Sequence, residues 1–545
     1  LKWGATIAGL NCGEMGLVCS VARAHGPDDS ALPEIDVSRL MFQKSWVFPK
    51  RTSRGATLHE AADSRFARGQ CLLFLEGASN VPYPDALHDI TCNAVSSKSH
   101  GKPYVRAYAM RNGGIVGQVV EWPARRWNNT PTWCSARSLG ISFAEKVSAN
   151  LCIELFDEQT QLGSIEIKLG DVPLHSTVTQ QLEQKLQTRN HQPSSVSFQV
   201  LDSRAFLERR TVFFVRHGES VWNKAQEQLQ LDEMVRTTDH PLSAKGRAQA
   251  ESLSQRIAKA AARARPELAE LLRPEAVYVS PLTRAIQTAV IALGPTMTQA
   301  NSQANVFLLA NAREKQNFGG LDSRPAMTGV GVLQRSLDEL KALYQGNGAG
   351  IVDTFNQLHF DVRDVEGIWW EEAASENKDQ LQVRMDEFMS QLLYSPHQSV
   401  VVVGHSHFFR AVFRRYLSAD FKDQNNKLAT EITIQKLMNC GVARLELDPT
   451  RGVEGEPIVN VQLVLETTLS SDAGLLTCCS ADQSMQRTQS GLSMEEWHGP
   501  AASYDPAETC TAENNTSLEE ERIVGVGPLR ISAPVRDAAT NVDKR

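Results

Sequence analysis

The chain has 545 residues, more than one ordinary hydrophobic core organises, so we expect about two to four domains or segments. Hydrophobic residues make up 41% and charged residues 22% of the chain, and its formal net charge of −7 argues against a general nucleic-acid binder, which needs clustered Lys and Arg. No stretch approaches the roughly 20 apolar residues that span a bilayer, so we predict no transmembrane segment.

The ten cysteines have irregular spacings and form no CxxC pair. This pattern predicts neither a zinc site nor a disulfide framework. We expect reduced, partly buried thiols, which fit a cytoplasmic location. The first residue is Leu1 rather than Met, which weakens any statement about targeting signals.

Residues 1–66 mix Gly, Ser, Asp and short apolar runs without sustained periodicity, and we interpret them as an irregular lead-in. Residues 7–19 have the apolar character of a short signal-like stretch, but Asn11 and Glu14 interrupt it.

Residues 67–203 contain short segments that favour β-strands, separated by stretches rich in turn-forming residues. Several strands at such spacing predict an antiparallel β-sandwich. The expected strands cover residues 70–76, 104–110, 151–156, 164–169 and 196–201.

Residues 208–466 change to alternating strands and helices. Continuous apolar strands that alternate with helices predict an α/β domain with a doubly wound, mostly parallel sheet. The expected strands cover residues 211–215, 276–280, 400–403, 439–448 and 458–465, and the expected helices cover residues 243–264, 285–291 and 408–416.

Residues 467–545 are rich in Ser, Thr, Asp, Glu, Asn and Gly and have little apolar periodicity. Such a segment buries too little apolar area to offset the entropy of the chain, so we predict a disordered tail.

Three expected strands end in cationic or imidazole side chains that are suited to an anion. VFFVRHGES at residues 212–220 places Arg216 and His217 after an apolar strand, where ligands bind in open α/β sheets. Gly218 lets the backbone approach a phosphate closely or adopt a positive φ. The tripeptide Arg216-His217-Gly218 alone is a weak signal, since Arg216 and His217 could also be ordinary surface residues.

The second and third motifs repeat the arrangement. YVSPLTRAIQT at residues 278–288 puts Arg284 in the first turn of a helix, where main-chain N–H groups favour an anion. VVVGHSHFFRA at residues 401–411 delivers His405 at the end of a buried strand. Three strand ends thus supply two arginines and two histidines.

The motifs occur in a fixed order: RHGE, then PLSAKGRAQA at residues 241–250, SPLTRAIQT, GHS, and NCGVARLEL near the domain's end. This order resembles the histidine phosphatase superfamily, which includes the phosphoglycerate mutases. The resemblance covers about 230 residues, less than half of the chain. It implies a doubly wound α/β sheet, phosphate transfer through a phosphohistidine, no cofactor and no metal.

The resemblance also assigns roles. The nucleophile must be a neutral imidazole, so we expect an acceptor such as a backbone carbonyl at its second ring nitrogen. Phosphoryl transfer needs positioning and stabilisation of charge, which fixed cations and N–H donors supply. The residues carried over are His217 as nucleophile, Arg216, Arg284 and His405 around the phosphoryl group, and Asn223 and Ser220 as substrate contacts.

The leaving oxygen needs a proton, and family members often carry the acid in an Arg-Glu segment followed by Phe-Gly. AREKQNFGGLDSRP at residues 312–325 makes Glu314 the candidate general acid. Phe318 follows one residue later than in many members, and Glu314 as a solvated loop carboxylate is the alternative. Asp322 is a weaker candidate.

Mutases of this family usually carry an FxGWxDxxL element after RHGESxWN, whereas this chain has QLDEMVRTTDHPLSAKG at residues 230–246. The sequence therefore favours a phosphatase acting on a phosphorylated small molecule or a phosphoprotein. A phosphoglycerate mutase-type phosphotransferase and a catalytically silent phospho-ligand-binding or scaffolding protein remain the alternatives.

Residues 67–203 resemble a C2 domain through QCLLFLEGASNVP, KPYVRAY, WNNTPTW and LCIELFDEQTQLGSIEI. Calcium-binding C2 domains supply aspartates from two loops. Asp157 is in place and Asp85 or Asp89 could contribute, but Lys102 and Gln159 stand where aspartates are expected. We therefore expect a calcium-independent module for membrane or protein contact, giving a cytoplasmic protein that is peripheral at a membrane. A sandwich without any ligand is the alternative.

Overall fold

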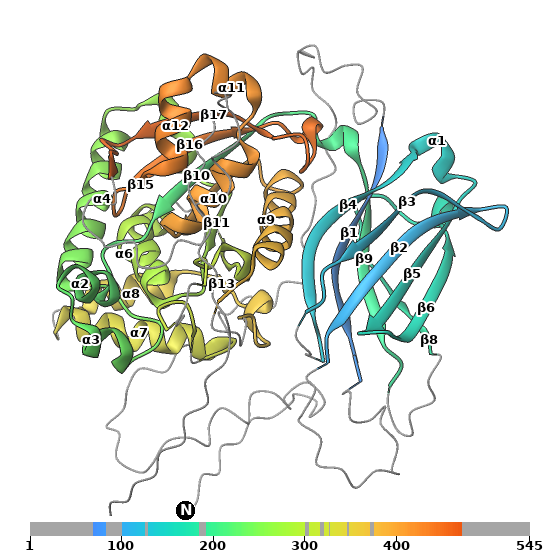
Figure 1. The fold of residues 1–545 in the computed structure, drawn as a ribbon, viewed down its shortest axis with the longest axis horizontal. Coiled ribbons are helices and arrows are strands. Elements are labelled where there is room, and N and C mark those ends of the chain that lie inside the picture. Colours follow the sequence, from blue (N-terminus) through green and yellow to red (C-terminus); the bar gives the residue numbers. More distant parts are fainter. Residues whose placement is uncertain are drawn as a thin grey trace, which may run out of the picture. The chain divides into compact units, whose positions relative to one another are not determined.

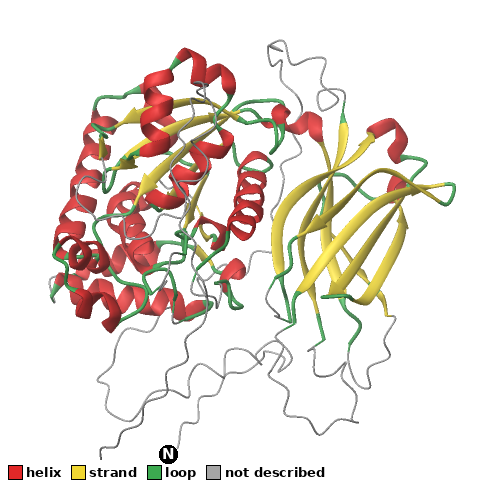
Figure 2. Ribbon diagram, viewed as in Figure 1, coloured by secondary structure: helices red, strands yellow, loops and turns green. Residues whose placement is uncertain are grey.

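The structure is a computed structural model that describes residues 69–82, 101–125, 129–184, 192–299, 305–316, 321–325, 327–345, 348–370 and 375–470. All of them lie in one compact unit, Leu1–Leu475. The predicted lead-in at 1–66 and nearly all of the predicted tail at 467–545 lie outside the described residues. Figure 1 labels the helices and strands, and Figure 2 colours them by type.

The first domain is an antiparallel β-sandwich, as the sequence predicted (Figure 2). One sheet has the order β4-β1-β9-β7 and the other the order β3-β2-β5-β6-β8. The apolar side chains of the two inner faces form one core, which includes Trp122, Trp133 and Phe198. The strands are β1 (Gln70–Ser79), β2 (Pro103–Arg111), β3 (Gly114–Trp122), β4 (Thr132–Ser142), β5 (Asn150–Asp157), β6 (Thr160–Lys168), β7 (Val178–Gln181), β8 (Glu183–Gln184) and β9 (Ser195–Asp202), with the short helix α1 (Phe143–Lys146) after β4.

The second domain is built on a seven-stranded sheet with the order β13-β12-β11-β14-β10-β16-β17. The first five strands in this order run parallel, and β16 and β17 are antiparallel additions. The predicted mostly parallel sheet is therefore confirmed. The strands are β10 (Arg210–Arg216), β11 (Ala276–Val279), β12 (Asn305–Leu308), β13 (Phe360–Asp361), β14 (Ser399–Gly404), β16 (Val442–Leu447) and β17 (Ile458–Val464), and β15 (Lys436–Leu437) pairs with β18 (Leu469–Ser470).

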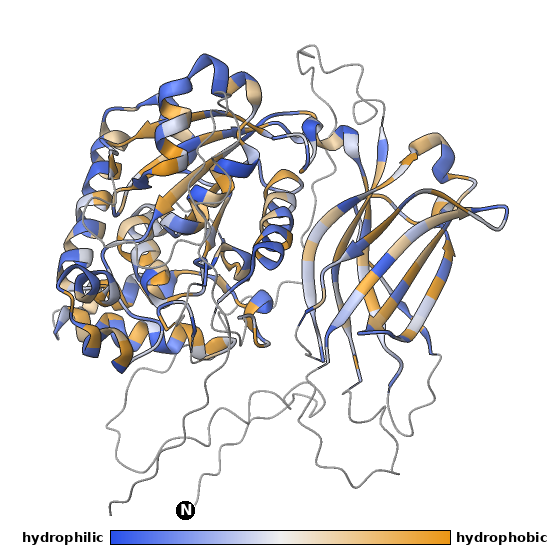
Figure 3. Ribbon diagram, viewed as in Figure 1, coloured by the Kyte–Doolittle hydropathy of each residue, from blue (hydrophilic) through white to orange (hydrophobic). Residues whose placement is uncertain are grey.

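Helices cover both faces of this sheet. Alternate residues of β10 point to opposite faces, so Phe213 joins a core with α4, α6, α7 and α8, whereas Phe214 joins a core with α9, α10 and α12. In Figure 3 hydrophobic residues follow β10, while α11 is largely hydrophilic. The helices are α2 (Val221–Glu227), α3 (Leu231–Arg236), α4 (Ala244–Ala262), α5 (Ala269–Leu272), α6 (Thr283–Gln299), α7 (Val330–Tyr344), α8 (Ala349–Gln357), α9 (Lys378–Leu393), α10 (Ser406–Tyr416), α11 (Ala419–Gln424) and α12 (Asn426–Ile434).

Gly218 owes its identity to close packing. A Cβ atom there would lie 2.6 Å from the carbonyl oxygen of Gly246, and a Cβ on Gly246 would lie 2.0 Å from the oxygen of Glu219. Gly218 is not among the glycines with positive φ. Of the two reasons that the sequence offered, the positive φ is therefore wrong, and the close approach to a phosphate stays a prediction. The close approach that the structure shows is to the start of α4.

Two sequence expectations about the whole chain concern cysteines and membranes. Cys71, Cys134, Cys152 and Cys440, the cysteines in the described part of the chain, are buried free thiols. Within the described residues, no helix is both long enough and apolar enough to cross a bilayer.

Candidate active site

His217 follows the last residue of β10, and its ring is nearly inaccessible, with 3% of the residue exposed. Its main-chain N–H donates to the carbonyl oxygen of Gly404 at 3.0 Å, which fixes the backbone beside the end of β14. Its Nδ1 lies 2.6 Å from the carbonyl oxygen of Gly218. Because a carbonyl oxygen only accepts, Nδ1 carries the hydrogen and Nε2 keeps its lone pair. This is the ring orientation that a nucleophilic Nε2 requires.

The surroundings of His217 favour its neutral form. Burial lowers its pKa well below the usual range, and the positive charges of Arg284 and Arg216 lower the pKa further. The hydrogen bond to the carbonyl of Gly218 acts in the opposite direction and does not outweigh them. His217 is therefore uncharged near neutral pH.

His405 follows the last strand residue of β14, which pairs with β10 in the sheet. Its ring centroid lies 4.9 Å from that of His217, and its Nε2 lies 2.7 Å from Oγ of Ser280, at the end of β11. Its Nδ1 is buried and makes no hydrogen bond with any described residue. Burial first, and then Arg284, lower the pKa of His405 well below its usual range.

Arg284 lies in the first turn of α6 and is 2% exposed. One terminal nitrogen donates to the main-chain oxygen of Asp322 at 2.5 Å, and the other lies 3.6 Å from its carboxylate. The guanidinium of Arg216 donates to the oxygen of Leu437 at 2.6 Å. Two guanidinium groups and two imidazoles therefore gather where β10, β11 and β14 end, and their catalytic roles stay predictions.

Residues that the sequence argument did not single out hold these side chains. Thr288 accepts from the N–H of Gly218 at 3.0 Å and donates to the oxygen of Arg284 at 2.7 Å, so one hydroxyl joins two motifs. Asn439 donates to the main-chain oxygen of His217 at 3.1 Å. Thr288 lies four residues after Arg284 on the same helix, which is the signal that could have found it.

Ser220 and Asn223, the predicted substrate contacts, form the N-terminal cap of α2. The hydroxyl of Ser220 accepts from the N–H of Asn223 at 3.1 Å, and the side-chain oxygen of Asn223 accepts from the N–H of Ser220 at 3.3 Å. This reciprocal pair is a capping box. Contact between these residues and substrate stays a prediction.

Glu314 is buried, with 5% of the residue exposed, rather than a solvated loop carboxylate. Its carboxylate accepts from the N–H groups of Lys315 at 2.8 Å and Phe408 at 2.9 Å, and from that of His407 at 3.4 Å. Glu314 therefore lies at the N-terminus of α10, the helix that begins directly after His405. Phe318, whose spacing from Glu314 is unusual, lies outside the described residues.

Asp322, the weaker candidate for the acid, lies beside Arg284. Burial raises its pKa, Arg284 lowers it, and the negative charge of Glu314 raises it. Asp322 therefore lies within the field of both Arg284 and Glu314.

Residues 212–305 match the model of the histidine phosphatase superfamily (branch 1). This part of the chain is a histidine phosphatase superfamily domain. Over 249 residues the chain is 26% identical to a phosphoglycerate mutase-like protein of Arabidopsis thaliana. The alignment covers 42% of this chain and 82% of that relative. Membership of this superfamily supports phosphatase or mutase-type activity for the domain.

Two solved structures are similar to parts of the chain. Mycobacterial hydrolase 1 matches with 18% identity and a TM-score of 0.26, covering 47% of this chain and 97% of that chain. The two calcium-bound C2 domains of extended synaptotagmin 2 match with 20% identity and a TM-score of 0.18, covering 25% of this chain. This chain spans 42% of the length of that synaptotagmin structure.

Asp157, which matches an aspartate of the calcium loops of C2 domains, is bonded by the backbone. Its carboxylate accepts from the main-chain N–H of Lys102 at 2.5 Å, and burial raises its pKa. Asp85 and Asp89 lie outside the described residues. Among the described residues, no group of three or more His, Cys, Asp or Glu side chains is arranged to hold a metal ion.

Proposed function

We propose that the protein is a phosphatase that hydrolyses a phosphomonoester through a phosphohistidine at His217. The observation that supports this most is the ring of His217, whose Nδ1–H is held by the carbonyl of Gly218 while two arginines lower its pKa. A neutral imidazole with a fixed tautomer, next to fixed positive charge, is suited to attack a phosphoryl group.

The reaction has two steps. In the first, Nε2 of His217 forms a bond to phosphorus, the bond from phosphorus to the leaving oxygen breaks, and Glu314 gives that oxygen a proton. In the second, water attacks the phosphorus, the P–N bond breaks, and Glu314 takes the proton of the water. Arg216, Arg284 and His405 stabilise the charge on the equatorial oxygens in both steps.

Glu314 is suited to this exchange because it lies next to the strand end that carries His405. Its oxygens accept from main-chain N–H groups, which stabilise the carboxylate that is left once the proton has passed to the leaving oxygen. Asp322, whose pKa is raised by burial, is the second candidate for the proton donor.

Hydrolysis rather than transfer is proposed because residues 230–246 lack the Gly-Trp element of the mutases. The experiment compares wild-type protein with His217→Ala, measuring inorganic phosphate release from p-nitrophenyl phosphate and phosphate migration on 3-phosphoglycerate. We expect phosphate release by the wild type alone. Equal rates for the two proteins would favour a silent phospho-ligand-binding protein, and migration without release would favour a mutase.

For the β-sandwich we propose contact with anionic lipid or with a protein, independent of calcium, which would make the protein cytoplasmic and peripheral at a membrane. The exposed side chain of Lys102 and the use of Asp157 by the backbone support this proposal. Flotation with phosphatidylserine vesicles, with calcium and with a chelator, tests it. Equal binding in both conditions is expected, and no binding in either would leave a structural sandwich.

A further inference from the structure

The β-sandwich and the histidine phosphatase domain share a core instead of merely touching. Leu72 and Phe74 of β1 belong to the same buried cluster as Phe214 and Phe388. Side chains of α9 also bond the main chain of β4: Ser390 donates to the oxygen of Ala136 at 2.7 Å, and Gln391 to that of Trp133 at 3.2 Å. The sandwich is therefore an integral support of α9.

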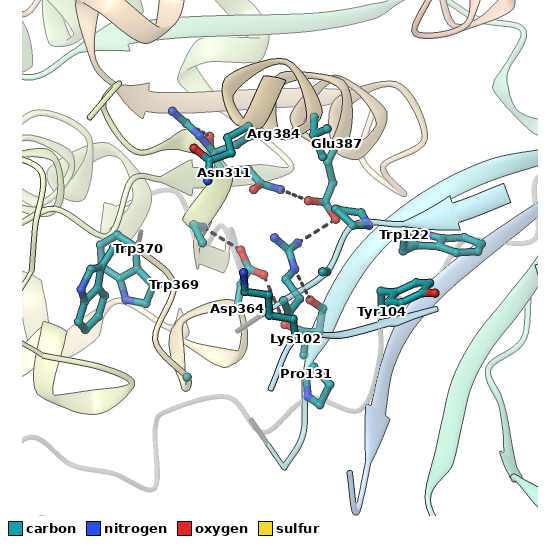
Figure 4. Close-up of a pocket in the computed structure, with 18 of the residues that line it drawn as sticks. Lys102, Tyr104, Trp122, Pro131, Asn311, Asp364, Trp369, Trp370, Arg384 and Glu387 are labelled. Atoms are coloured by element: carbon teal, nitrogen blue, oxygen red, sulfur yellow. Dashed lines mark hydrogen bonds and ion pairs between the residues drawn. The ribbon is translucent and has the colours of Figure 1, made fainter. Parts of the chain in front are cut away.

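One charged side chain that follows β3 of the sandwich, Arg125, forms an ion pair with α9. The guanidinium of Arg125 donates to one carboxylate oxygen of Glu387, in α9, at 2.8 Å. Glu387 is fully buried, whereas the Arg125 side chain is 22% exposed. The other oxygen of Glu387 accepts from the side-chain amide of Asn311 at 3.0 Å. Figure 4 shows Glu387 with Asn311 and the dashed contacts that join them to the sandwich.

Asn311 belongs to the short 3₁₀ turn η8 (Ala310–Ala312), two residues before Arg313 and three before Glu314. The N–H of Ala310 donates to Asp364 at 2.7 Å, and Asp364 also accepts from Thr132 of the sandwich at 3.4 Å. The turn that leads into the candidate acid is thus tied to the sandwich by two separate carboxylates.

Resting on the function proposed above, we propose that Arg125 is a positioning residue, which holds Glu314 in place through Glu387 and Asn311. Without the guanidinium, the buried carboxylate of Glu387 loses its cation and must draw on other partners. The amide of Asn311, which also donates to Gln391 at 3.1 Å, then shifts toward that second partner, and η8 and Glu314 move with it. The sandwich thereby sets the efficiency of the proton donor.

The surroundings allow this test without unfolding the protein. Arg125, Asn311 and Glu387 line a cavity of about 1040 Å³ between the sandwich and α9, which His217, Arg284 and His405 do not line. Water in this cavity can solvate Glu387 when Arg125 is shortened. The hydrogen bonds between α9 and β4 and the shared core do not involve Arg125, so we expect the substitution to leave them in place.

The experiment exploits the leaving group. Phenol is a weaker acid than p-nitrophenol, so phenyl phosphate depends on the proton donor more than p-nitrophenyl phosphate does. For Arg125→Ala we expect kcat/KM to fall about tenfold on phenyl phosphate and less than about twofold on p-nitrophenyl phosphate, because a misplaced acid forfeits part of a general-acid effect of about 10²–10⁴. Arg125→Lys should restore most of the loss.

The matched control is Arg106→Ala, which removes another sandwich arginine whose 2.7 Å ion pair with Glu121 lies on the surface. It should leave both substrates unaffected. An equal fall on both substrates for Arg125→Ala, or no fall on either, would overturn the proposal. If that variant fails to fold, Asn311→Ala cuts the same link and must show the same selective loss. Equal activity of wild type and His217→Ala would instead remove the proposed function itself.

Discussion

The two domains use the polar groups at their strand ends in different ways. In the sandwich, Asp157 at the end of β5 is bonded by the backbone N–H of Lys102, so a residue typical of calcium loops serves the fold. In the histidine phosphatase domain, Nδ1 of His405 and Nε of Arg284 are buried without a partner among the described residues. Buried polar atoms are costly when unsatisfied, so we propose that the phosphate of the substrate bonds these two atoms.

The comparison is tested most strongly at Arg284. Arg284→Ala removes a buried cation that lowers the pKa of both histidines. Loss of one well-placed donor costs about 2.7–4 kcal/mol of barrier, so kcat should fall by about 10²–10³. Lys102→Ala, the corresponding change in the sandwich, should leave kcat unchanged. Steady-state phosphate release measures both, and similar losses would contradict the distinction.

The pH dependence of kcat/KM sharpens the account of His217. Because its folded-state pKa is lowered, the ring stays neutral as pH falls through the ordinary histidine value of about 6.5. After correction for substrate ionisation, activity should hold at that pH and decline only below it. In Arg284→Gln the decline should move to higher pH. A wild-type decline centred on the ordinary value would contradict the burial of a neutral nucleophile.

Asp364, at the junction of the two domains, should make stability depend on pH. Burial raises its pKa from 3.8 to about 6, so the folded protein binds this proton more tightly than the unfolded chain. The contribution is therefore most favourable below the unfolded value and is lost as pH rises through the folded one. Asp364→Asn should remove on the order of 1–3 kcal/mol of this dependence. Urea unfolding at pH values between the unfolded and the folded pKa of Asp364 measures this dependence. If the free energy of unfolding varies with pH equally in wild type and variant, the raised pKa of Asp364 is contradicted.

The smallest effect is expected at Ser220. Ser220→Ala removes the hydroxyl that caps α2, which should cost about 1 kcal/mol of unfolding free energy. Thermal unfolding measures this loss, with Ser142→Ala, at the cap of α1 in the sandwich, as the matched change. If Ser220 also contacts substrate, KM rises as well; an unchanged KM would leave it a cap alone.

The sequence predicted the α/β domain well because the motifs of this domain are short, continuous segments of the chain. Each motif is a buried strand followed at once by a charged turn, so the neighbouring strands β11, β14 and β10 were enough to expect Arg284, His405 and His217 together. The sandwich was harder. The edge strand β3 is mostly exposed and shows no alternation of polar and apolar residues, and it was not predicted.

Individual hydrogen bonds between distant segments could not be predicted. Glu314 bonds the start of α10 across 94 residues, and Gln391 bonds Trp133 across 258 residues. Neither contact leaves a periodicity or a motif in the chain. Gly218 carried a signal, but its cause, the close approach of Gly246, is visible only in three dimensions.

The central claim is that the neutral ring of His217 takes the phosphoryl group. The protein is mixed with substrate and quenched within milliseconds in alkali, in which phosphohistidine survives. Peptide mass spectra should then show phosphate on His217. His405→Ala should lower the amount, and His217→Ala should abolish it. Phosphate on another residue, or release at full rate by His217→Ala, would contradict the account.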